Sequence, residues 1–80
     1  MTINVLAFGM AKEIFENPSA DIELDDEATV SDLKTLLEKK FPRMKKLGSY
    51  MIAVNNEYAE DKKSIGINDE IAIIPPVSGG

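Results

Sequence analysis

Apolar and polar residues alternate along several short stretches of this chain, which is the pattern of a half-buried β-strand. Residues 2–8 place Ile3 and Val5 on one face and Leu6 and Phe8 on the other. Each such stretch is short enough to be a single strand of a small sheet. The pattern predicts further strands at residues 21–24, at 50–54, around Tyr58 and at 70–74.

A helical spacing of apolar residues replaces the alternation after Thr29. The Thr29 hydroxyl can cap a helix, and Asp32 places a carboxylate near the positive end of the helix dipole. The helix should end at Phe41, because Pro42 cannot continue it. A shorter helix is predicted at 10–16. The stripe facing the sheet comprises Val30, Leu33, Leu36, Leu37 and Phe41.

The order of these elements predicts an α+β fold. Two strands, a helix and three more strands do not alternate as a doubly wound α/β fold requires, whereas a mixed sheet of about five strands over one main helix accommodates them. Asn55 and Asn56 tolerate positive φ and suit a tight hairpin turn. The prediction is a β-grasp, or ubiquitin-like, domain at residues 1–74, with an extended, flexible tail at 75–80.

Composition removes most forms of side-chain catalysis. The 80 residues include no cysteine and no histidine, which excludes disulfides, thiol nucleophiles, histidine-based triads and the usual zinc sites. Fourteen acidic and nine basic side chains give a net charge of −5, which argues against nucleic acid and membrane partners. The start of the chain does not resemble a signal peptide. We therefore expect a cytoplasmic protein with no bound metal.

The segment after Ile74 is the candidate site. Pro75 and Pro76 favour an extended chain that leaves the sheet, and six residues at about 3.1–3.5 Å each reach on the order of 20 Å. Gly79 and Gly80 have no side chains, so a narrow channel in a partner could close around them. A frayed, inert terminus is the alternative interpretation.

Several stretches resemble the small subunit of molybdopterin synthase. The most specific runs from Asp69 to Gly80, and it is joined by residues 8–13, 29–33 and 54–55. The resemblance covers essentially the whole chain. Departures occur at Lys12, where the family usually carries arginine, at Asn68 and at 56–57, and they affect partner contacts more than the fold.

This resemblance implies a sulfur carrier that is not catalytic alone. An activating enzyme would use ATP to adenylate the carboxylate of Gly80, and a sulfur donor would convert it to a thiocarboxylate. The tail would then enter the large synthase subunit, in a heterotetramer, and pass sulfur to a pterin precursor in molybdenum cofactor biosynthesis. No cofactor would be bound permanently. The residues expected to contact partners are Phe8, Ile73, Pro75, Pro76, Val77 and Ser78, with Gly79 and Gly80 at the reacting end.

Other functions stay open at this stage. A thiamine-type sulfur carrier and a ubiquitin-like protein modifier share the β-grasp and the diglycine end.

Phe8 and Ile73, together with Tyr50 and Met51, are candidates for an apolar docking patch, although core packing is expected for at least half of these four. Two charged clusters are interpreted as solvated surface or as support for the helix dipole: Arg43, Lys45 and Lys46, and Asp25, Asp26 and Glu27.

Overall fold

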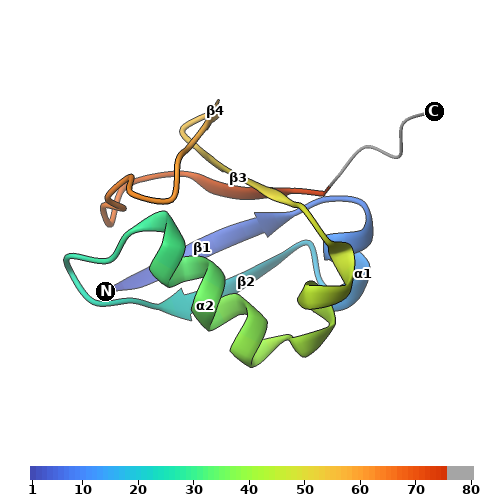
Figure 1. Cartoon of the computed structure of the whole chain (residues 1–80). Coiled ribbons are helices and arrows are strands. Elements are labelled where there is room, and N and C mark those ends of the chain that lie inside the picture. Colours follow the sequence, from blue (N-terminus) through green and yellow to red (C-terminus); the bar gives the residue numbers. More distant parts are fainter. Residues whose placement is uncertain (76–80) are drawn as a thin grey trace.

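The computed structural model describes residues 1–75, which form a five-stranded mixed sheet crossed on one face by the main helix (Figure 1). The sheet order is β2-β1-β5-β3-β4, with β1 and β5 parallel and the other pairs antiparallel. This arrangement confirms the predicted β-grasp fold. The strands are β1 (Thr2–Ala7), β2 (Ser19–Glu23), β3 (Met51–Val54), β4 (Glu57–Tyr58) and β5 (Ile71–Ile74). The helices are α1 (Met10–Phe15), α2 (Val30–Lys40) and the 3₁₀-helix η1 (Pro42–Leu47).

Strand alternation separates the two faces of the sheet. In β5, Ile71 and Ile73 are fully buried, while Ala72 and Ile74 are partly exposed on the opposite face. Leu33 and Leu37 of α2 are also fully buried. The face covered by α2 is therefore the core. Burying one side chain of this size stabilises the fold by about 1.5–3 kcal/mol relative to leaving it exposed.

The main helix begins as predicted. Thr29 and Asp32 form a reciprocal capping box: the Asp32 N–H donates to Thr29 Oγ1 at 3.3 Å, and the Thr29 N–H donates to Asp32 Oδ2 at 2.9 Å. The helix ends at Lys40, and Pro42 then starts η1, which was not predicted. Phe41 between them stacks on Phe15 of α1, with ring centroids 4.5 Å apart.

A hydrogen-bonded clasp joins the β3–β4 turn to the start of β5. Asn55 and Asn56 have φ of 54° and 68°, as predicted for this turn. The Asn55 side chain donates to Asp69 Oδ1 and accepts from the Glu70 N–H, both at 2.9 Å. Asp69 Oδ2 accepts from the Gly66 N–H at 2.7 Å. These bonds fix where β5 enters the sheet.

Among residues 1–75, no helix combines the length and the apolar character needed to cross a membrane. The described chain therefore contains no membrane-spanning helix. Of the predicted tail, only Pro75 lies within this range, and 76–80 lie outside the described residues.

Candidate functional site

The face of the sheet opposite α2 carries an apolar surface built from four strands. Register explains its composition: Ala72 of β5 lies beside Leu6 of β1 and Ala53 of β3, and Ala53 also pairs with Tyr58 of β4. Small side chains therefore meet at the centre, and larger ones surround them. The same face continues through Met51, which pairs with Ile74.

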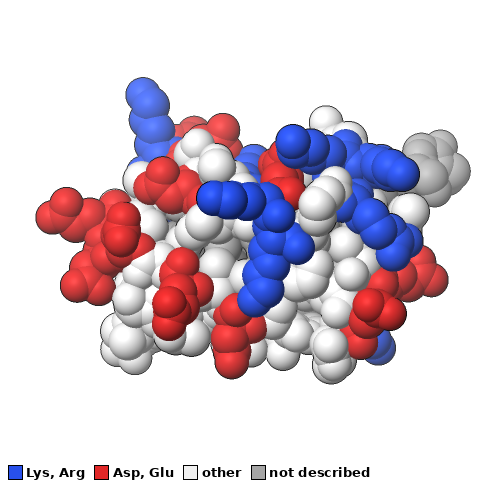
Figure 2. All heavy atoms as spheres, turned by 90° about the horizontal axis from the view of Figure 1, so that it is seen from below, with Lys and Arg blue, Asp and Glu red and all other residues white. Residues whose placement is uncertain are grey.

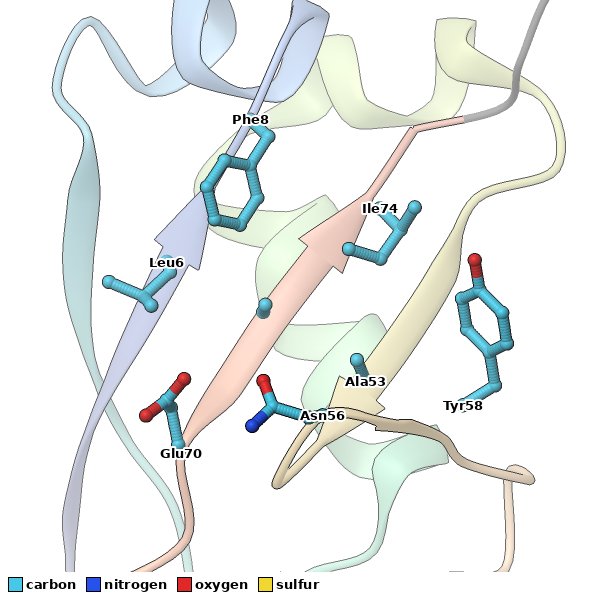
Figure 3. A pocket seen from close by; sticks show the side chains of 8 residues that line it. Leu6, Phe8, Ala53, Asn56, Tyr58, Glu70 and Ile74 are labelled. Atoms are coloured by element: carbon cyan, nitrogen blue, oxygen red, sulfur yellow. The ribbon is translucent and has the colours of Figure 1, made fainter.

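A hollow of about 310 Å³ lies over the two alanines (Figure 3). Phe8 and Ile74 stand at one side of it and Tyr58 at another, while Asn56 and Glu70 make its end polar. Phe8 is 51% exposed and Tyr58 is 69% exposed. Its full lining is Leu6, Phe8, Ala53, Asn56, Tyr58, Glu70, Ala72 and Ile74.

The polar end of the hollow is held by the clasp around Asp69. The hydrogen bond from the Gly66 backbone N–H, with a second from the Asn55 side chain, holds the pKa of the Asp69 carboxyl below its usual value. Glu70, whose backbone N–H joins the clasp, carries a carboxylate into the hollow. A charged group therefore borders the apolar surface.

The side chains lining the hollow suit recognition rather than catalysis. The described residues contain no group of three or more carboxylates that could hold a metal ion, and the lining offers neither an activated nucleophile nor a paired acid and base. Exposed aromatic and aliphatic side chains beside a shallow depression are typical of a protein-docking surface.

The chain leaves β5 beside this surface. Pro75 is partly exposed and lies close to Gly9, at the turn between β1 and α1; a methyl group added at Gly9 would be 3.3 Å from Pro75 Cγ. Gly9 has φ of 56° and ψ of −128°, a conformation that side chains disfavour. The Phe8–Gly9 turn thus links the hollow to the point where the chain leaves the sheet.

The structure separates the predicted partner-contact residues. Phe8 lies on the outer surface and Pro75 beside Gly9, but Ile73 is fully buried in the core. The prediction that the Ile73 side chain contacts a partner is therefore wrong, because alternation along β5 turns Ile74 outward instead. The remaining predicted site residues lie outside the described range: Pro76, Val77, Ser78, Gly79 and Gly80.

Two members of the predicted docking patch also have different positions. Tyr50 is 7% exposed and donates a hydrogen bond to Glu38 at 2.9 Å, whereas Met51 is 46% exposed. Burial and this bond raise the pKa of Tyr50. Sequence reasoning missed Tyr58 and Ala53. Strand register was the signal that would have placed Ala53 opposite Ala72 and Tyr58 opposite Ala53, and it depends on the strand order, which cannot be read directly from the sequence.

Comparison with known proteins gives a match over nearly the whole chain. The profile of the ThiS family matches residues 5–80. The molybdopterin synthase sulfur carrier subunit of Dictyostelium discoideum is 42% identical over 80 residues, covering 95% of this chain and 93% of that protein.

Solved structures are similar in fold. SAMP1 from Haloferax volcanii superposes with a TM-score of 0.85 at 24% identity, covering 100% of both chains. The small archaeal modifier protein 1 from Methanosarcina acetivorans gives a TM-score of 0.77 at 26% identity, over 99% of this chain and 96% of that one. A chain of the complex of subunits 1 and 2 of the molybdopterin-converting factor from Helicobacter pylori gives 0.70 at 27%, covering 100% of both.

Proposed function

The chain belongs to the ThiS family, and on that premise we propose that it is the sulfur carrier subunit of a molybdopterin synthase. The observation that carries this proposal is 42% identity, over 95% of the chain, to a curated sulfur carrier subunit of that synthase. The docking surface on the outer face of the sheet supports it, since a carrier without catalytic side chains needs partners to perform the chemistry.

The reacting group in this proposal is the carboxylate of Gly80. One carboxylate oxygen attacks the α-phosphorus of ATP on the activating enzyme, and pyrophosphate leaves to give an acyl adenylate. Sulfide from a donor then attacks the acyl carbon, and AMP leaves with the bonding electrons. The product is a thiocarboxylate. Gly79 and the preceding residues, 75–78, would give Gly80 access to the active sites of both enzymes.

The large synthase subunit is the proposed sulfur acceptor enzyme. A relative of this chain forms a complex with subunit 2 of its molybdopterin-converting factor. We propose that the hollow beside Phe8 and Tyr58 docks on the large subunit, so that the chain beyond Pro75 reaches the pterin precursor. Two carriers and two large subunits would form the heterotetramer.

Reconstitution tests this function. The carrier is treated with ATP, its activating enzyme and a sulfide donor, then purified and mixed with the large subunit and a sulfur-free pterin precursor. We expect the dithiolene product in an amount limited by the charged carrier, and none with a carrier lacking Gly80. Equal product from both carriers would overturn the proposal.

A protein modifier is the second candidate, because the chain is 26% identical to a small archaeal modifier protein with the same fold. In that case the activated Gly80 would form an isopeptide bond with a lysine amine, and the adenylate would leave. A ladder of conjugates on a denaturing gel, lost when Gly80 is deleted, would support this function. Absence of such a ladder in cells with active synthase would exclude it.

A further inference from the structure

Five positively charged side chains cluster at the end of α2 and along η1. Lys and Arg side chains gather over the centre and the upper right of this face in Figure 2, while Asp and Glu side chains crowd its left-hand end and also lie along its lower edge and at the lower right. This clustering occurs in a chain whose net charge is −5. We name the exposed cations Lys39, Lys40, Arg43, Lys45 and Lys46 the basic surface.

The backbone beneath the basic surface is anchored. Met44 is fully buried and Leu47 is 7% exposed, so η1 is held to the core between its cations. The Met44 N–H donates to the Phe41 carbonyl at 2.9 Å, and Phe41 stacks on Phe15 of α1. The charged side chains therefore extend from a fixed turn. Less conformational entropy is lost on binding when the backbone is already ordered.

No carboxylate among residues 1–75 forms an ion pair with the basic surface, although Asp21 and Glu23 line the same groove as Lys39 and Lys40. The two ion pairs among residues 1–75 lie elsewhere: the Met1 ammonium pairs with Asp26, and Lys34 pairs with Asp61. Lys40 Nζ donates a hydrogen bond of 3.3 Å to the backbone carbonyl of Asp21. Because that carbonyl carries no net charge, the bond does not neutralise Lys40. Exposed acids on neighbouring α1, such as Glu13, form no ion pair with these cations. The three cations of η1, Arg43, Lys45 and Lys46, are therefore exposed and form no ion pair with a carboxylate among residues 1–75.

The basic surface lies at the same end of the molecule as the start of the tail. The Phe15–Phe41 stack places η1 against α1. α1 follows directly after Gly9, and Pro75 lies close to Gly9, since a methyl group added at Gly9 would be 3.3 Å from Pro75 Cγ. In Figure 1, β5 also ends on the side of the molecule where α1 lies. A protein that receives the chain beyond Pro75 must approach this end and bring its own surface near η1.

We propose that the basic surface docks on an acidic rim of the large synthase subunit, around the opening that receives residues 76–80. This inference rests on the proposed function and adds a second contact to the hollow on the sheet. The contact steers the carrier into place, because complementary charge acts mainly on the association rate. Nucleic acid is the less suitable occupant, since the net charge of −5 opposes its approach.

The test compares two variants with the same change in charge. Lys45→Glu/Lys46→Glu alters the basic surface, and Lys62→Glu/Lys63→Glu alters two exposed lysines in the loop after β4. Association rates of the full chain with the large subunit are measured at about 50 mM and about 500 mM salt. At low salt we expect the first variant to associate about tenfold more slowly than wild type, and the control less than threefold more slowly. At high salt both should approach the wild-type rate.

Equal slowing of the two variants at low salt would overturn the inference, because net charge alone would then explain the effect. A tenfold difference that persists at high salt would also contradict electrostatic steering. Matching unfolding midpoints show that the variants are folded, and Lys45→Gln/Lys46→Gln should give an intermediate rate. If wild-type carrier does not bind the large subunit at either salt concentration, the proposed function itself fails.

Discussion

Two exposed aromatic side chains, Phe8 and Tyr58, offer the strongest test of the hollow as a docking site. Aromatic residues in such positions often dominate binding energy, and truncating one typically costs more than 1 kcal/mol. We expect Phe8→Ala and Tyr58→Ala each to weaken binding to the large subunit by about tenfold, measured by calorimetry. Ile67→Ala is the matched control, because Ile67 is 64% exposed and does not line the hollow. Equal affinities for the three variants would place the interface elsewhere.

Alanine variants of Gly9 and Gly48 distinguish the effect of backbone strain from the effect of crowding against Pro75. Both have positive φ, 56° and 69°, but a methyl group at Gly9 would meet Pro75 Cγ, whereas at Gly48 it would meet nothing within 4 Å. We expect each alanine variant to lower the free energy of unfolding by about 1–3 kcal/mol, measured with denaturant. Only Gly9→Ala should also slow sulfur transfer. Equal transfer rates in the two variants would show that crowding between residue 9 and Pro75 does not affect sulfur transfer.

At the scale of single residues, sequence identified the outward position of Phe8 but misassigned Ile73. A shift of one position along a strand changes the face on which a side chain lies. Ile73 and Ile74 are equally apolar, so composition could not distinguish them. Ile74 can be placed on the outer face only once Ile71 is known to face the core, because positions 71 and 74 lie on opposite faces of the strand.

The capping box is the device that starts α2, and its contribution can be measured. Thr29→Ala removes the hydroxyl that accepts from the Asp32 N–H, and the expected cost is about 1 kcal/mol. A domain of this size should then unfold roughly 4–8 °C lower. Thr35→Ala in the same helix is the control and should be neutral or slightly stabilising, because alanine favours helix interiors. An equal loss in both variants would contradict a specific capping effect.

The clasp at the start of β5 should make stability depend on acid. The pKa of Asp69 is lowered in the folded state, so its contribution is fully present above about pH 4 and is lost as pH falls through the folded pKa. The wild-type advantage over Asp69→Asn in unfolding free energy should therefore shrink below about pH 4. Denaturant titrations at several pH values measure it, and an advantage that grows in acid would contradict this assignment.

At the scale of elements, sequence predicted the main helix with both of its ends, but not η1. Cations dominate 42–47, and the segment was interpreted as solvated surface. Met44 and Leu47 are three residues apart, which is the spacing of one 3₁₀ turn, and both are buried. Two apolar positions are too few to define a periodic pattern, so η1 could be assigned only from the structure, which shows that both side chains are buried in the core.

At the scale of the whole molecule, the central position of β5 connects fold and function. β5 lies between β1 and β3, so the strand that leads to the tail is fixed on both sides. The sequence pattern predicted a strand at 70–74, yet its central place in the sheet and its parallel pairing with β1 arise from tertiary structure. The side of the hollow formed by Phe8 and Ile74 and the basic surface both lie near the end of the molecule where β5 ends.

The central claim is that Gly80 carries the transferable sulfur, and intact mass tests it most directly. Wild-type chain and a variant lacking Gly80 are each incubated with ATP, the activating enzyme and a sulfide donor. We expect a mass gain equal to the replacement of one oxygen by one sulfur in the wild-type chain and no gain in the variant. An unchanged wild-type mass, with an activating enzyme shown to be active on another carrier, would contradict the account.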